Sequence, residues 1–205
     1  MKLTPWILTL IAAAGLIPAR ASSHAIHPPA EDSDVTVYFA RIGPMANAVW
    51  KTGETTALQL FGRIGVHLRF ANARPAQPDS GAINLLVLNR APKNLKPHVL
   101  GAAKTDPEYG PVVFVFYDRV LEFCASTYTE ETGIVLGYVI AHELGHALRS
   151  EPGHSQAGVM KGHWDQKDAA AMLKHLVSFT RADSERIHLG LADRKLAKTA
   201  PTGGN

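Results

Sequence analysis

The segment 134–148 constrains the fold more than any other, because it has the length of a helix and is apolar almost all the way round. A helix of that kind is buried in the middle of a domain. Pro152 and Gly153 follow it and stop it. Thr127 and Glu130 fit a capping box, so the helix is expected to begin between residues 126 and 133. The rest of the chain must supply elements that cover this helix.

The residues before this helix predict a sheet. Runs of β-branched and aromatic residues favour strands at 35–42, 66–71, 83–88 and 112–117, and a shorter strand at 98–103. Segment 83–88 is so continuously apolar that we expect it to be buried on both faces. Segment 45–63 holds enough helix formers for a helix between the first two strands.

Two more helices are expected after the long one. Asp165 fits the N-cap of a helix that reaches residue 176, and a third helix spans 180–189, with Gly190 at its C-terminal end. This order of elements predicts an α+β fold of the α/β sandwich type. A mixed, twisted sheet with a backing helix is expected to lie over the long helix, with the last helices at the C-terminal end.

The N-terminus has the pattern of an export signal. Lys2 is the only charge before an apolar run at 6–17, and Ala19 and Ala21 form a small-x-small cleavage site. The run is shorter than the ~20 apolar residues of a membrane-spanning helix. We therefore expect residues 1–21 to be removed and the protein to be periplasmic or extracellular, with Ala25 as a second candidate for the cut.

The charge balance argues against nucleic-acid and membrane partners, and the cysteine content argues against an intrachain disulfide. Residues 1–21 hold two basic residues and no acidic one. The rest of the chain therefore has 19 Lys and Arg residues and 18 Asp and Glu residues, so its net charge is close to zero. Such a balance gives no electrostatic reason to expect nucleic acid or a membrane as partner. Cys124 is the single cysteine, so no intrachain disulfide can form, and we expect it to be buried. A chain of this length fits one domain, and we expect a monomer.

The chemistry of the chain is concentrated in the long helix, which carries His142, Glu143 and His146. Residues four apart share one helix face, so both imidazoles can bind one tetrahedral zinc ion. Glu143 lies about 100° round the helix, where it can take a proton from a zinc-bound water. Two purely structural histidines are the alternative, but buried titratable groups are costly unless a metal or hydrogen bonds compensate for them.

A catalytic zinc ion usually has three protein ligands and one open position. His154 is the best third ligand, because Pro152 and Gly153 can turn the chain back towards the metal. Glu151 precedes that turn and is a weaker candidate, and Glu185 in a later helix is the other acidic alternative. His163 is expected to be a surface histidine, although it is near enough in sequence to touch a substrate.

At these residues the chain resembles the metzincin zinc peptidases, and among them a compact bacterial matrixin-like member. In that family two helical histidines and a third one after the helix bind zinc, above a turn that contains a methionine. The matching residues here are His142, His146, His154 and Met160, with Glu143 as the base. The resemblance implies that Met160 is a structural support and that 99–103 is an edge strand holding an extended peptide.

Two positions depart from the metzincin pattern. Arg149 stands where the family usually has a glycine, and His154 comes eight residues after His146 where the family has six. Pro152 and Gly153 lie in this longer segment and supply its turn.

The sequence thus predicts an exported zinc endopeptidase with one catalytic zinc ion and a peptide or protein substrate. Residues 22–34 are expected to form a flexible arm, 35–190 the zinc metallopeptidase domain and 191–205 a disordered tail. One alternative is another zinc hydrolase, such as a cell-wall amidase, with Glu185 as third ligand. A second is a zinc-binding or partner-binding module without turnover.

Overall fold

A computed structural model describes residues 33–72, 81–149 and 151–199 of the chain. The expected signal peptide 1–21 lies outside the described residues, as does most of the expected arm at 22–34. The last two residues of that arm, Ser33 and Asp34, are not part of an arm, because they begin the first strand. Within the described residues, the helices are all too short or too polar to cross a membrane.

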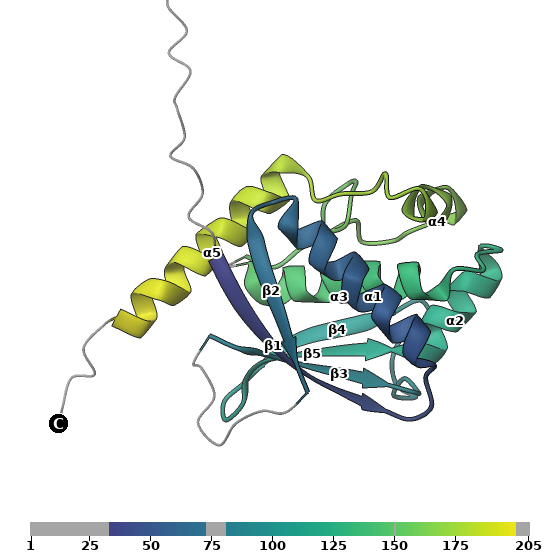
Figure 1. Cartoon of the computed structure of the whole chain (residues 1–205), viewed down its shortest axis with the longest axis horizontal. Coiled ribbons are helices and arrows are strands. Elements are labelled where there is room, and N and C mark those ends of the chain that lie inside the picture. Colours follow the sequence, from purple (N-terminus) through teal and green to yellow (C-terminus); the bar gives the residue numbers. More distant parts are fainter. Residues whose placement is uncertain (1–32, 73–80, 150, 200–205) are drawn as a thin grey trace, which may run out of the picture.

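Five strands form one mixed, twisted sheet (Figure 1). The strands are β1 (Ser33–Ile42), β2 (Val66–Ala71), β3 (Ile83–Leu88), β4 (Gly101–Asp106) and β5 (Gly110–Phe116). Their order across the sheet is β2-β1-β3-β5-β4. All neighbours run parallel except β4, which pairs antiparallel with β5 and forms one edge. The expected α+β fold with a mixed sheet is therefore confirmed.

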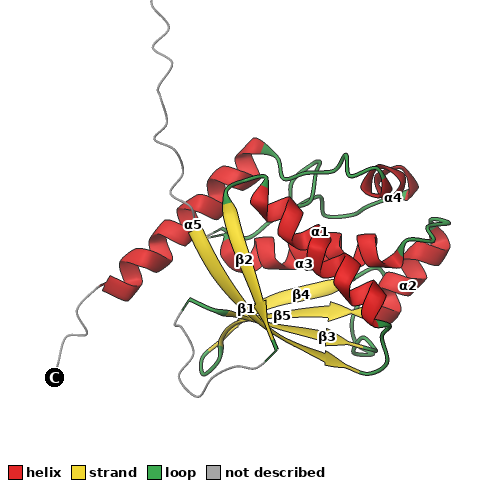
Figure 2. Cartoon of the chain, viewed as in Figure 1, coloured by secondary structure: helices red, strands yellow, loops and turns green. Residues whose placement is uncertain are grey.

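The helices gather on one face of the sheet (Figure 2). The two that lie against it are α1 (Asn47–Gly62) and α3 (Thr132–Leu148). Along β3, Ile83, Leu85 and Val87 are buried, whereas the residues between them are half-buried. The expectation that 83–88 is buried on both faces is wrong, because only one face of the sheet is covered by helices in the described structure.

Close contact between α1 and α3 explains glycines that are poor helix formers. A Cβ atom on Gly137 would lie 2.6 Å from the carbonyl oxygen of Gly53 and would also collide with Thr56. Gly53 weakens the helix expected at 45–63 when it is judged by propensity alone. In the folded protein it lets α3 approach α1, and α3 is buried along nearly its whole length.

A short helix, α2 (Tyr117–Ser126), lies between β5 and α3 and is not expected from the sequence. The expected capping box is not formed either. The hydroxyl of Thr127 donates a hydrogen bond to the carbonyl of Phe123, at the end of α2. Helix α3 begins after Glu131 without a side-chain cap. The expected start between 126 and 133 nevertheless includes the observed one.

The C-terminal helices are α4 (Gln166–Leu173) and α5 (Arg181–Thr199). Asp165 is the N-cap of α4, as expected, and it forms a capping box with Asp168. The helix ends at Leu173 and not at residue 176, because His175 takes a positive φ of 53°. The expected end at Gly190 and the expected disordered tail from 191 are wrong as far as Thr199. Leu191 is buried, and Arg194 donates to the carbonyl of Ala147, so contacts with the body hold the helix beyond Gly190.

Candidate metal centre

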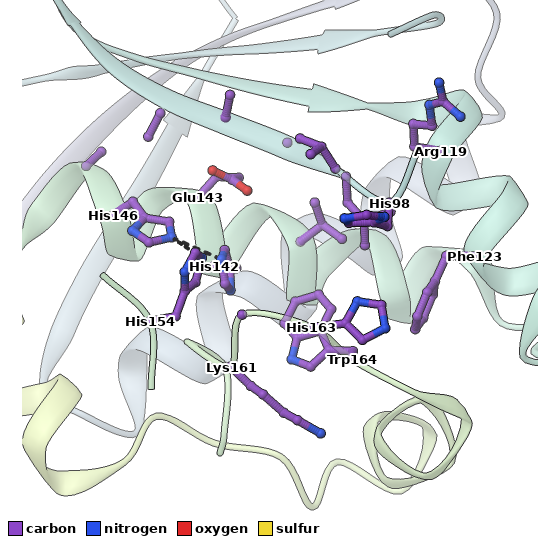
Figure 3. Close-up of a pocket in the computed structure, with 18 of the residues that line it drawn as sticks. His98, Arg119, Phe123, His142, Glu143, His146, His154, Lys161, His163 and Trp164 are labelled. Carbon is purple, nitrogen blue, oxygen red and sulfur yellow. Dashed lines mark hydrogen bonds between the residues drawn. The ribbon is translucent and has the colours of Figure 1, made fainter. Parts of the chain in front are cut away.

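Three imidazole rings converge beside α3 (Figure 3). The Nε2 atom of His146 lies 3.1 Å from Nε2 of His142 and 3.1 Å from Nε2 of His154. Nitrogen atoms of all three rings lie within 4.8 Å of one another. Among the described residues, this is the one group of three or more metal-binding side chains close enough to share an ion.

Local structure explains the convergence. His142 and His146 are four residues apart on α3 and so share a helix face. The chain leaves the helix after Leu148, and Gly153 adopts a φ of +117°, which a residue with a side chain rarely takes. The turn at Gly153 brings His154 back to the helical pair, as its position after Pro152 leads us to expect.

A backbone carbonyl fixes the orientation of the first ring. The Nδ1 atom of His142 lies 2.7 Å from the carbonyl oxygen of Val159, so Nδ1 carries the proton and donates it. Nε2 is then unprotonated and directed at the other two rings. Metal-binding histidines are held in their tautomer by this kind of contact.

Burial keeps the helical histidines neutral. It lowers the pKa of His142 to about 4, and that of His146 to about 3, with a further lowering from the neighbouring rings. Both rings therefore offer lone pairs at neutral pH. Three neutral nitrogen donors at one point suit zinc, which prefers nitrogen and sulfur ligands.

The spacing also fits a tetrahedral ion. Two nitrogens that each lie ~2.0–2.1 Å from a tetrahedral zinc are about 3.3 Å apart. The two separations measured from His146, 3.1 Å each, differ from this by a few tenths of an ångström, and nitrogens of all three rings lie within 4.8 Å of one another. The set of three histidines thus fits a metal site.

Glu143 lies between the histidine pair and the edge strand β4 (Figure 3). Glu143 is 6% exposed, and burial raises the pKa of its carboxyl to about 8. A Cβ atom on Gly101 of β4 would lie 2.6 Å from its Cγ and 2.8 Å from its Cδ. The space for this carboxyl therefore depends on a glycine in the neighbouring strand.

Met160 packs beneath the metal centre. It is fully buried, and its sulfur lies so close to Gly145 that a Cβ atom there would collide with it. Its carbonyl accepts a 2.8 Å hydrogen bond from the amide of Ser155, which follows His154 directly. Met160 thus touches the helix that carries two of the rings and the segment that carries the third.

The three rings open into a cleft of about 1090 Å³. Its walls come from β4 and the residues before it, α2, α3 and the loop after Met160. His163 lines the cleft, with its ring 5.8 Å from that of His98 on the opposite wall. It is exposed, as expected, but it faces the cleft. Trp164 stands between this part and the metal centre, 5.2 Å from the ring of His142.

The two acidic alternatives lie away from the three nitrogens. Glu185 sits on α5, with its side chain 52% exposed and paired with Arg181 at 2.8 Å. Glu151 is 72% exposed at its side chain, and its carboxylate lies 3.9 Å from Arg186. The short strand expected at 98–103, with 99–103 as the edge strand that the resemblance implies, begins later, at Gly101. Residues 97–105 nevertheless all line the cleft.

Three features of the site are missed by sequence reasoning. Gly101 had a signal, because an isolated glycine in a strand often marks a close approach. Arg149 and Asp183 form a buried ion pair between distant segments, and no short motif contains both. The Val159 carbonyl is a main-chain group, so its role leaves no mark in the residue type.

Comparison with known proteins finds likenesses among solved structures alone. The chain matches no family model and no curated protein. Among solved structures, archaemetzincin from Methanopyrus kandleri is similar, with 16% sequence identity and a TM-score of 0.49 over 82% of this chain and 99% of that one. At this identity and TM-score the likeness establishes neither a family nor an activity.

Proposed function

We propose that the protein is an exported zinc-dependent endopeptidase of the metzincin type, closest to the matrixin-like members. The observation that carries the proposal is the convergence of His142, His146 and His154 beside the buried carboxyl of Glu143. The signal-like sequence pattern at 1–21 and the match of Met160 to the metzincin pattern support the finer parts of it. One zinc ion would be held by the three histidines.

Zinc, when bound, supplies a Lewis acid that polarises a carbonyl group and makes water a stronger acid. The chain's own contribution is Glu143, whose carboxylate accepts the proton of the attacking water and passes it to the leaving amine. Burial keeps that carboxyl protonated at neutral pH in the metal-free protein. A nearby cation favours its ionised form, which is the form that a general base needs.

The position of the cleft supports a peptide substrate. β4 is an edge strand, and residues 97–105 line the cleft along its length. An extended peptide can add to such an edge through main-chain hydrogen bonds. A chain held this way passes the metal centre with residues on both sides, which suits cleavage within a peptide.

Neither alternative function gains support from the site. The amidase alternative needs Glu185 as third ligand, and Glu185 is exposed and paired with Arg181. A module without turnover has no need of a buried carboxyl beside its metal, and the burial of Glu143 is costly. We therefore keep the endopeptidase as the proposed function.

The test compares the wild type with Glu143→Gln, after zinc loading, on a casein-type substrate. Both proteins should hold about one zinc ion, but the variant should lose roughly 10²–10⁴-fold in turnover, because it lacks the proton acceptor. Equal rates would contradict the role of Glu143. Export is tested separately, by N-terminal sequencing of the protein recovered from the periplasm or the culture medium of the host. Ser22 is expected as the first residue.

A further inference from the structure

The buried side chain of Arg149 joins the end of α3 to the loop that carries His154. Its guanidinium donates to the carbonyl of Gly153 at 2.5 Å and to that of Glu151 at 3.3 Å. Its Nε donates to the same Glu151 carbonyl at 3.4 Å. His154 directly follows Gly153, so one side chain, 2% exposed, holds the main chain immediately before the third ring.

Asp183 completes the arrangement from α5. It is fully buried and lies 3.3 Å from Nη1 of Arg149. Its Oδ1 also accepts a hydrogen bond from the hydroxyl of Ser155 at 2.5 Å, and its Oδ2 accepts one from Thr180 at 2.6 Å. Arg149 and Asp183 thus hold the residues on both sides of His154, one from before and one from after.

This buried network has the geometry to fix the main chain around His154. An arginine presents donors in a rigid fork, which lets one side chain span two carbonyls and a carboxylate. Charged groups this deeply buried are costly unless their hydrogen bonds are satisfied. The same residues explain why two extra residues before His154 do not displace it, since Arg149 binds the carbonyls of that longer turn.

We propose that Arg149 and Asp183 are positioning residues for the third metal ligand, which they hold against the helical pair. This inference rests on the proposed function, because it presumes that His154 binds zinc. Neither residue is among the three nitrogen ligands. They act on the metal through the main chain on either side of His154.

The test is a double-mutant cycle on zinc affinity, measured by competition with a chelator at neutral pH. Four proteins are compared: the wild type, Arg149→Met, His154→Ala and the double variant. Groups that orient metal ligands typically contribute 10–100-fold in affinity, so Arg149→Met should weaken zinc binding by about that factor. In the His154→Ala background the same change should produce no further loss, because the ring on which Arg149 acts is gone.

Two further variants keep the test decisive. If Arg149→Met does not fold, Ser155→Ala replaces it in the cycle, because it removes the hydrogen bond to Asp183 from the residue next to His154. Leu68→Ala is the control for general destabilisation. Leu68 is buried in β2, at the sheet edge opposite β4, so this variant should melt earlier yet keep wild-type zinc affinity.

The possible results distinguish failure of the positioning role from failure of the proposed function. Wild-type zinc affinity in Arg149→Met, or an equal loss in both backgrounds, would show that the ion pair only stabilises the fold and would overturn the inference. A wild-type protein that binds no zinc would overturn the proposed function and, with it, the inference. Loss of affinity confined to the background that retains His154 would support both.

Discussion

The carboxyl of Glu143 lies directly against the backbone of Gly101. A Cβ atom at position 101 would stand 2.6 Å from Cγ of Glu143 and 2.7 Å from the carbonyl oxygen of Phe114. Real Cβ atoms do not approach other atoms so closely. The edge strand that is proposed to receive the substrate therefore also sets the position of the general base.

Gly101→Ala should consequently impair catalysis without removing the metal. The added methyl group must push the Glu143 side chain aside, and a misplacement of ~1 Å can cost about 10²-fold in rate. Overpacking should also destabilise the fold by about 1–3 kcal/mol. Zinc content, thermal unfolding and kcat/KM on one peptide would measure the three effects.

Gly62→Ala is the matched control for that variant. A Cβ atom at Gly62, the last residue of α1, meets nothing within 4 Å. Alanine is the better helix former by roughly 1 kcal/mol, so stability should stay level or rise and kcat/KM should not change. Full activity of Gly101→Ala would show that Glu143 does not need this space.

Glu143→Gln should stabilise the metal-free protein at alkaline pH. Burial raises the pKa of Glu143 from 4.5 to about 8, so the folded state binds its proton more tightly than the unfolded state does. The stability that this provides is complete below pH 4.5 and is lost as the pH rises through 8. Glutamine mimics the protonated acid and does not ionise.

The advantage of the variant should therefore grow from near zero at pH 4.5 to the order of a few kcal/mol above pH 8. Urea unfolding of both proteins, with a chelator present, at several pH values would measure it. Glu185→Gln, at an exposed position, should follow the wild type throughout. A difference between Glu143→Gln and the wild type that does not vary with pH would mean that the carboxyl is not buried as described.

His154→Ala and Glu185→Ala should differ sharply in zinc affinity. Nε2 of His154 lies 3.1 Å from that of His146, whereas Glu185 pairs with Arg181 on the exposed side of α5. Loss of the third ligand should weaken binding strongly, and loss of Glu185 should leave it unchanged. Isothermal titration of the metal-free proteins would decide, and the reverse order would restore Glu185 as a ligand.

The sequence predicts those parts of the site that depend on spacing along one element. His142 and His146 share a face because a helix has 3.6 residues per turn. The burial of 134–148 is predicted by apolar residues on nearly all sides of the helix. The same is true of β1, β2, β3 and β5, which are rich in β-branched, aromatic and other apolar residues, whereas β4 has few such residues and its expected bounds are three residues too early. His154 follows from the turn that Pro152 and Gly153 allow.

The rest depends on contacts between distant segments. Leu191 and Arg194 extend α5 beyond Gly190 because they meet the body of the domain, which local propensity does not reveal. Arg149 departs from the metzincin pattern, and its partner Asp183 lies 34 residues away. The helix α2 is short, and its apolar positions merge with the strand before it, so periodicity does not separate the two.

The central claim is that His142, His146 and His154 together hold one zinc ion. Anomalous diffraction at the zinc absorption edge, from crystals of the zinc-loaded protein, tests it most directly. The account predicts a single strong peak between the three Nε2 atoms, each ~2.0–2.1 Å from it, with Glu143 close by but not bound. A peak at other residues, or none between these rings in zinc-loaded crystals, would contradict it.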